Sequence, residues 1–134
     1  MKTIGINHVT LLVKNKIETE KFFTQLLGLE KYDAGGRLWI RVGEKFLHIS
    51  ENSGVPTRNS FYHFAIEVDN VEDCAREIVA KGVKVFDLDE NEHEILVNTE
   101  FDKPIRQFFL KDPDGNLIEL IDINNQFFNP RVGI

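Results

Sequence analysis

The stretch INHVTLLV at residues 6–13 decides the fold, because FYHFAIEV at residues 61–68 repeats its pattern. Both stretches carry a histidine at the third position, followed by a mainly apolar run of the length of a β-strand. A second pair of segments repeats in the same way, EKFLHIS at residues 44–50 and GNLIELI at residues 115–121. Self-similarity of this kind indicates that one structural module is used twice.

Each first strand is followed by a segment with the pattern of an amphipathic helix. Asn15 and Asn70 are typical helix N-caps, and a glycine ends each pattern. The apolar positions have the same i, i+3, i+4, i+7 spacing in both segments. They are Thr19, Phe22, Phe23 and Leu26 in the first segment, and Val71, Cys74, Ala75 and Ile78 in the second.

Strand-like runs follow each helix, at residues 36–42 and 46–50 in the first half and at residues 105–110 and 116–121 in the second. The last two runs are joined by the turn DPDGN, in which proline presets φ and glycine accepts a positive φ. Each half therefore reads as a βαβββ module.

We predict an α+β fold in which two βαβββ modules are related by pseudo-two-fold symmetry and form a curved mixed sheet around a metal site. Module one covers residues 4–51 and module two residues 60–122, within a single domain of residues 1–134. The linker at residues 52–60 is polar and rich in turn-forming residues. The C-terminal tail at residues 123–134 contains apolar side chains, and we expect it to pack on the domain or on a neighbouring chain.

The composition excludes several classes of function. The chain of 134 residues has 22 acidic and 16 basic residues and a net charge of -6, and the basic residues are scattered, which argues against nucleic-acid binding. No apolar run approaches the roughly 20 residues of a membrane span, so we expect a cytoplasmic protein with a small-molecule substrate and no membrane partner. Cys74 is the single cysteine, which excludes an internal disulfide and a cysteine-rich zinc site.

Four potential metal ligands stand at matching positions of the two modules: His8, His48, His63 and Glu119. Each module has a histidine early in its first strand and a histidine or glutamate in the middle of its last strand. If the modules pack about a pseudo-two-fold axis, equivalent positions converge, and the four side chains face one point. Three imidazoles and one carboxylate then form a site for a divalent metal ion.

Strand alternation supports a special role for Glu119, because apolar residues flank it on both faces of its strand. An ionised carboxylate in such surroundings is costly unless it is neutralised or coordinated. Two plainer interpretations stay open: half-buried histidines bonded to the backbone, and a buried His–Glu hydrogen-bonded cluster without metal. His93 has no counterpart in the other half, and we expect it to be solvated.

Candidate substrate contacts lie on neighbouring strands. Trp39 and Phe108 occupy the corresponding penultimate strands of the modules, where an aromatic ring is either part of the core or the wall of a ligand site. Arg106 either binds an anionic substrate or edges the sheet. The charged stretch at residues 88–104 has a weak pattern, and we expect a mobile loop near the site. Cys74 lies on the inner face of its helix and is expected to be a small core residue.

Together these motifs resemble the glyoxalase/bleomycin-resistance/dioxygenase superfamily, also called vicinal oxygen chelate proteins. The resemblance covers residues 4–122, and its most specific part is DPDGNLIEL at residues 112–120. It implies a divalent metal, Zn, Ni, Mn, Co or Fe, held by the first and last strands of the modules. These positions correspond to His8, His63 and Glu119.

His48 departs from the pattern of glyoxalase I, which commonly has a glutamate there. Glu119 is then the only carboxylate among the ligands and takes the catalytic role of proton shuttle. The resemblance implies a glyoxalase-like, metal-dependent isomerase or lyase that acts on a small substrate with adjacent oxygens, where the metal stabilises a developing enediolate. It also implies a homodimer.

Three other activities of the same superfamily stay open. Ring-cleaving dioxygenases bind iron through two histidines and one carboxylate, and a fourth ligand such as His48 fills a position that the iron keeps open. Thiol transferases of the fosfomycin-resistance type share NHVT at residues 7–10 and place the equivalent of Thr10 near substrate, but the arginine after their last strand is not evident here. Non-catalytic bleomycin-binding proteins sequester a drug without metal, which four ligand-type residues argue against.

Overall fold

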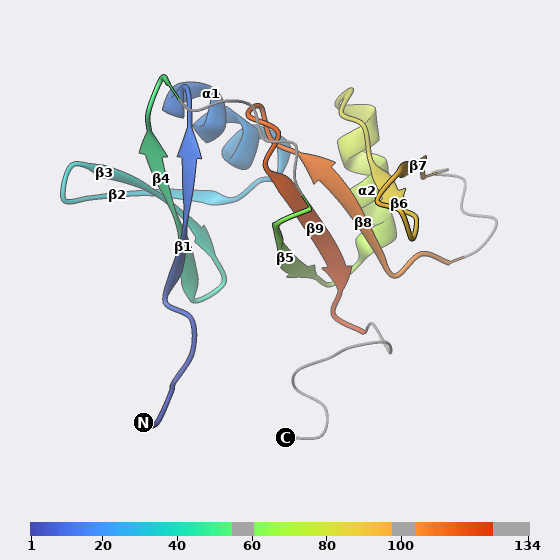
Figure 1. The fold of residues 1–134 in the computed structure, drawn as a ribbon, viewed down its shortest axis with the longest axis horizontal. Coiled ribbons are helices and arrows are strands. Elements are labelled where there is room, and N and C mark those ends of the chain that lie inside the picture. The colour runs from blue at the N-terminus through green and yellow to red at the C-terminus, as the bar shows by residue number, and fades with distance from the viewer. Residues whose placement is uncertain (55–60, 98–103, 125–134) are drawn as a thin grey trace. The chain divides into compact units, whose positions relative to one another are not determined.

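The chain folds into two compact units, and each contains one of the two sequence repeats (Figure 1). The first unit comprises Met1–Asn59 together with Asp112–Asn116. The second unit comprises Ser60–Lys111 and Leu117–Ile134. The predicted modules one and two thus fall into different units, and the turn DPDGN groups with the first.

The computed structural model describes residues 1–54, 61–97 and 104–124. Most of the predicted linker, the centre of the predicted loop and nearly all of the predicted C-terminal tail lie outside the described residues. Within these ranges, no helix has the length and apolar character needed to cross a bilayer.

The first unit is a four-stranded mixed sheet with one helical segment. Its elements in chain order are β1 (His8–Val13), α1 (Lys16–Lys21), the π-helix η1 (Phe22–Leu26), β2 (Glu30–Ala34), β3 (Arg37–Val42) and β4 (Lys45–Glu51). The strand order is β1-β4-β3-β2, in which β1 runs parallel to β4 and the other neighbours are antiparallel. This is the predicted βαβββ module.

The second unit repeats this plan with one additional strand. Its elements are β5 (His63–Val68), α2 (Val71–Ala80), β6 (Phe86–Leu88), β7 (Glu94–Leu96), β8 (Gln107–Lys111) and β9 (Leu117–Asp122). The strand order is β5-β9-β8-β6-β7, and β5 runs parallel to β9. The additional strand β7 lies in the stretch that we expected to be irregular, where it pairs with β6. The predicted α+β class and the mixed sheets are confirmed.

The parallel strand pair has the same register in both units. In the first unit, the partner of His8 on β4 lies two residues before His48. In the second unit, the partner of His63 on β9 lies two residues before Glu119. The repeat seen in the sequence therefore extends to the pairing of the strands that carry the candidate ligands.

Both helices begin at the predicted N-caps. The side chain of Asn15 accepts hydrogen bonds from the backbone N–H groups of Ile17 and Glu18, at 3.0 and 3.3 Å. The side chain of Asn70 accepts from the N–H of Asp73 at 3.1 Å. These bonds satisfy amide groups that have no partner inside the helix.

A carboxylate at the end of the last strand completes each helix start. Glu51 of β4 accepts from the N–H of Lys16 at 2.9 Å, and Asp122 of β9 accepts from the N–H of Val71 at 3.2 Å. Negative charge is favourable at a helix N-terminus. The last strand and the helix of each unit are therefore tied together.

Alternation along the strands separates a buried face from a more exposed face in the first unit, whereas both faces of the second sheet carry buried residues. On one face of each sheet, the buried strand residues are Leu11, Val13, Leu38, Ile40, Leu47 and Ile49 in the first unit, and Ile66, Phe108, Leu110, Ile118 and Leu120 in the second. In the second unit, Phe86, Phe109 and Leu117 are buried on the other face as well, where Phe109 lies opposite Glu119. The buried helical residues are Thr19, Phe22 and Phe23, and Val71, Ala75 and Ile78. The predicted inner faces of both helices are confirmed except at Leu26 and Cys74, which are half-buried. The candidate ligands lie on the faces of the sheets that point away from the helices, and in the second unit this face also carries buried apolar residues.

The turn between β8 and β9 is organised by one buried carboxylate. Asp112 accepts from the N–H of Asp114 at 2.9 Å and from the N–H and the Nδ2 of Asn116, both at 2.8 Å. Gly115 has the predicted positive φ, 80°. Burial raises the pKa of Asp112, against the opposing effect of the hydrogen bonds from Asn116 and Asp114. Asp114 in turn accepts from the N–H of Lys14 at 3.1 Å.

Candidate metal centre

In the second unit, His63 and Glu119 meet on the same face of β5 and β9, next to the buried side chains of Phe109 and Leu117. His63 is the first residue of β5, Glu119 lies in the middle of β9, and 3.0 Å separates Nε2 of the histidine from Oε2 of the glutamate. Their side chains are only 22% and 16% exposed. On the other side of the ring, Nδ1 of His63 lies 2.8 Å from the carbonyl oxygen of Phe61.

Both ring nitrogens of His63 thus face an oxygen that accepts hydrogen bonds when the carboxylate is ionised. In a neutral imidazole, Nδ1 donates its proton to the carbonyl of Phe61, and the lone pair of Nε2 then points toward Glu119. Two lone pairs at this distance repel each other unless a positive charge or a proton lies between them. That positive charge is either a second proton shared by His63 and Glu119, or a cation bound by Nε2 of the histidine and Oε2 of the glutamate.

The spacing of these two atoms suits a metal ion. With bonds of roughly 2.1 Å, two neighbouring ligand atoms lie about 3.0–3.4 Å apart in octahedral or tetrahedral geometry. The distance of 3.0 Å between His63 and Glu119 falls in this range. A backbone carbonyl bonded to the second ring nitrogen is also the usual outer partner of a ligating histidine. The donor atoms therefore fit a divalent ion.

In the first unit, His8 and His48 lie on the open face of β1 and β4, with their ring centres 6.2 Å apart. Nδ1 of His8 is 2.8 Å from Oδ1 of Asn7, and Nδ1 of His48 is 3.4 Å from Oγ1 of Thr10. Partial burial, followed by the charges of Arg37 and His8, lowers the pKa of His48. The neutral ring is the form that a metal ion requires.

The candidate ligands therefore form two pairs, one in each unit, at equivalent positions of the two sheets. In the described ranges, no group of three or more His, Cys, Asp or Glu side chains is gathered as a metal site. The pair within each unit is an observation, and the convergence of all four ligands on one ion stays a prediction.

The strand register corrects one predicted substrate contact. Trp39 of β3 lies opposite His48, and the two rings stack with centres 4.6 Å apart. In β8, however, the residue opposite Glu119 is Phe109, whereas Phe108 points to the other face and is completely buried. Phe109, rather than Phe108, is the counterpart of Trp39.

The reason for this error is the length of the two hairpin turns. The turn between β3 and β4 has two residues, because Val42 pairs with Lys45. The turn between β8 and β9 has five, because Lys111 pairs with Leu117. The two turns differ in length by an odd number of residues, so the strand pairing in the second hairpin is shifted by one residue relative to the first. A shift of one residue places the neighbouring side chain on the ligand face. Counting outward from each turn identifies Phe109.

The remaining predicted residues lie elsewhere. Arg106 is exposed and precedes β8, and its carbonyl accepts from the N–H of Asp122 at 2.9 Å. The side chain of His93 is 77% exposed and lies 3.4 Å from Asp89, as expected for a solvated residue. Cys74 is half-buried in α2, where burial raises the pKa of its thiol and disfavours the reactive thiolate.

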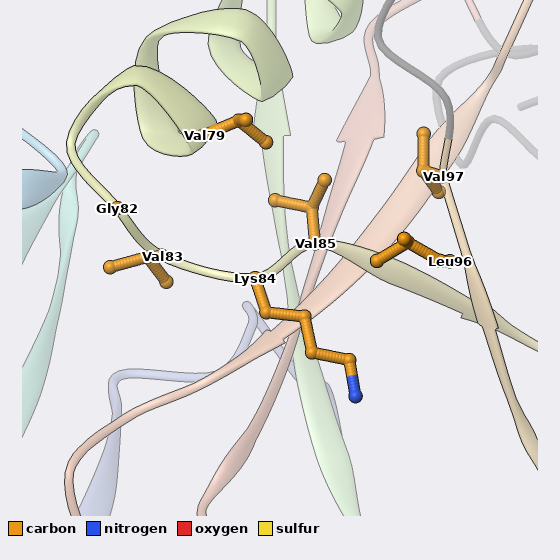
Figure 2. A pocket seen from close by; sticks show the side chains of 7 residues that line it. All are labelled: Val79, Gly82, Val83, Lys84, Val85, Leu96 and Val97. Atoms are coloured by element: carbon orange, nitrogen blue, oxygen red, sulfur yellow. The ribbon is translucent and has the colours of Figure 1, made fainter.

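A hollow in the second unit contains none of the candidate residues (Figure 2). It is lined by Val79, Gly82, Val83, Lys84, Val85, Leu96 and Val97. The side chains are apolar except for Lys84, whose amino group pairs with Glu94. The hollow therefore offers no carboxylate or imidazole for metal chemistry.

Solved structures share this fold over most of their length. A protein from the mobile metagenome of V. pseudocholerae has 21% sequence identity and a TM-score of 0.68, with 93% of this chain and 98% of the other covered. A protein from Bacillus anthracis assigned to the glyoxalase family has 23% identity and a TM-score of 0.67, with 91% and 97% covered. The fosfomycin resistance protein FosX from Listeria monocytogenes has 20% identity and a TM-score of 0.66, with 90% and 94% covered. At these identities the likeness is one of fold alone.

No curated protein matches the chain in sequence. A family model matches residues 5–120, which include both repeats and all four candidate ligands. The chain therefore belongs to the Glyoxalase/Bleomycin resistance protein/Dioxygenase superfamily.

Proposed function

We propose that the protein is a divalent-metal-dependent enzyme that acts on a small substrate with two adjacent oxygen atoms. The observation that carries the proposal is the setting of His63, whose Nδ1 faces a carbonyl and whose Nε2 lies 3.0 Å from the carboxylate of Glu119. A metal ion held by both side chains would supply the positive charge that this arrangement requires. Membership of a superfamily that is generally metal-dependent supports the same assignment.

His8 and His48 are the proposed second pair of ligands. Their support is the strand register, which gives them the same relation as His63 and Glu119 have in the other unit. Imidazole nitrogen and carboxylate oxygen suit Zn, Ni, Mn, Co and Fe. When bound, such an ion would polarise the two substrate oxygens and stabilise negative charge that develops on them.

Glu119 is the proposed catalytic base, because it is the only carboxylate among the four residues. Its oxygen takes a proton from the carbon beside the substrate oxygens and returns it to the neighbouring carbon, which is an isomerisation. His63 orients the carboxylate for this transfer through its contact at 3.0 Å. The low exposure of both side chains, 22% for His63 and 16% for Glu119, limits competing proton exchange with water.

Calorimetric titration of chelator-stripped protein with Zn²⁺, Ni²⁺, Co²⁺, Mn²⁺ and Fe²⁺ tests the metal. Stoichiometric binding is expected, together with a rise in melting temperature, because a ligand that binds only the native state stabilises it. Failure of all five ions to bind would eliminate the metal assignment.

Four variants separate a ligand role from a general effect of mutation. His63→Ala and Glu119→Gln should weaken metal binding by at least about tenfold, since loss of an outer partner of a ligand already costs that much. The matched controls are His93→Ala and Glu90→Gln, at exposed positions of the same unit. The controls should bind metal like the wild type, and an equal loss in all four variants would contradict the assignment.

Turnover of methylglyoxal–thiol adducts by the metal-loaded protein tests the reaction class. Glu119→Gln, saturated with metal, should be slower by about 10²–10⁴-fold, as expected for loss of a general base. A wild-type rate in this variant would reject Glu119 as the base. Oxygen consumption with catechol by the iron-loaded protein would instead assign a ring-cleaving dioxygenase.

A further inference from the structure

The open face of the first sheet carries a strip of aromatic side chains beside its two histidines. Tyr32 of β2 lies opposite Trp39 of β3, and Trp39 lies opposite His48 of β4. The ring of Phe46, two residues before His48, has its centre 5.8 Å from Tyr32 and 6.2 Å from Trp39. Tyr32, Trp39 and Phe46 form this aromatic strip, which ends at a proposed metal ligand.

The aromatic strip is separate from the core of the unit. Alternate residues of the same strands, such as Leu38, Ile40 and Leu47, fill the buried face. By contrast, Tyr32 is 55% exposed, and the other two rings of the strip are half-buried. Cross-strand pairing explains why the rings contact one another. Cross-strand pairing does not explain why this partly exposed apolar surface lies beside the two histidines. An apolar surface next to a few polar groups is the usual composition of a small-molecule site.

Trp39 is held at three points. Its Nε1 donates to the carbonyl of Ala34 at 3.3 Å, and its ring stacks on His48 with centres 4.6 Å apart and planes inclined by 29°. The ring of His8 meets it edge-on at 5.3 Å. A ring that is already fixed loses little freedom when a ligand packs on it. Trp39 therefore connects both histidines to a preformed apolar surface.

From this arrangement we infer that the substrate carries a planar aromatic group next to its two oxygens and that the aromatic strip binds this group. The inference rests on the proposed function, because the oxygens must bind a metal ion held by His8 and His48 for the substituent to reach the strip. A substituent that extends from His48 across β3 toward β2 meets Trp39 and then Tyr32, and Phe46 of β4 lies beside both rings. An aromatic ring makes offset and edge-to-face contacts there that a methyl group does not make. Tyr32 and Phe46 thus determine specificity.

Benzohydroxamate and acetohydroxamate provide the test. Both probes chelate through two adjacent oxygens, and they differ in carrying a phenyl ring or a methyl group. Calorimetry with protein that holds stoichiometric Ni²⁺ or Zn²⁺ measures both Kd values, and Trp39, the single tryptophan of the chain, reports by fluorescence quenching where the ring binds. We expect benzohydroxamate to bind about tenfold more tightly and to quench Trp39 more strongly.

The two tyrosines of the chain give a matched pair of variants. Tyr32→Leu should lower the affinity ratio of the two probes by roughly threefold, as expected for the loss of one aromatic contact. Tyr62→Leu changes an exposed ring of the other unit and should leave the ratio unchanged. Phe46→Leu provides a second variant within the strip, with folding checked by thermal melting.

The outcomes separate this inference from the proposed function. Metal-dependent binding of both probes with equal affinity would overturn the aromatic inference and leave the metal site standing. Preference for benzohydroxamate that Tyr32→Leu and Phe46→Leu leave unchanged would also overturn it, because the ring would then bind elsewhere. Absence of binding of either probe to the metal-loaded protein would overturn the proposed function together with the inference.

Discussion

Replacing Asp112 by alanine should destabilise the protein by about 2–3 kcal/mol, because each buried donor left without an acceptor costs about 1–3 kcal/mol. The carboxylate accepts from the N–H of Asp114 and from the N–H and Nδ2 of Asn116, at 2.8–2.9 Å. It is 5% exposed, so water does not replace it fully. Burial disfavours the charged form of this carboxylate, so its removal offsets part of the lost stability. The expected decrease in unfolding free energy therefore stays near the cost of one or two unsatisfied donors.

Urea unfolding measures this change in unfolding free energy. The transition is monitored both by the fluorescence of Trp39 and by circular dichroism, because the chain has two units and both signals must report the same transition. A lower midpoint with an unchanged m-value is expected. Asp114→Ala is the comparison, since it removes one accepted bond, from Lys14, and should cost about 1 kcal/mol. A loss below about 0.5 kcal/mol for Asp112→Ala would refute the view that its carboxylate organises the turn.

Three further predictions concern pH, a helix start and assembly. Burial raises the native pKa of Asp112 above the unfolded value of 3.8, so this group favours folding most below pH 3.8, and its contribution is lost as pH rises through the native pKa. The stability of wild type relative to Asp112→Asn should therefore fall over that window in urea titrations, and a pH-independent difference would contradict the raised pKa. Asn70→Ala should cost about 1 kcal/mol in unfolding free energy and Asn70→Gly only a few tenths, and equal losses would argue against the cap as the cause. Light scattering should give twice the chain mass of 15.5 kDa for the proposed dimer, and the monomer mass at micromolar concentration would rule that dimer out.

Local patterns in the sequence were sufficient to predict most strands and both helix starts. The N-caps at Asn15 and Asn70 are confirmed because capping depends on a few neighbouring residues. The strands β2 and β6 were not assigned to particular residues. The strand β7 was missed because it has only three residues, all exposed and without alternation. The π-helix was missed because its wider turn follows from packing, with the adjacent rings of Phe22 and Phe23 both buried.

The residues of the candidate site also fall into those that the sequence pattern predicts and those that it does not. Matching repeat positions identified the residues that form the two pairs, because equal register in parallel strands places equivalent residues side by side. The repeat pattern also predicted that all four residues meet at one point, and this convergence stays a prediction. Phe109 was missed because its position depends on the length of a turn rather than on the strand pattern. The carbonyl that fixes the ring of His63 was not predictable either, because it belongs to the backbone of Phe61 and every residue carries the same group.

The hydrogen bond from Lys14 to Asp114 joins residues 100 positions apart. The turn that carries Asp114 belongs with the first unit, although it follows most of the second unit along the chain. At roughly 5–20 residues per second, a ribosome needs about 3–12 s to proceed from Glu51, the end of β4, to this turn. During that interval β1 through β4 are already synthesised, but Lys14 still lacks its hydrogen bond to Asp114. The two repeats are therefore not interchangeable halves: the second unit consists only of residues from Ser60 onward, whereas the first unit also needs Asp112–Asn116, which follow most of the second unit along the chain.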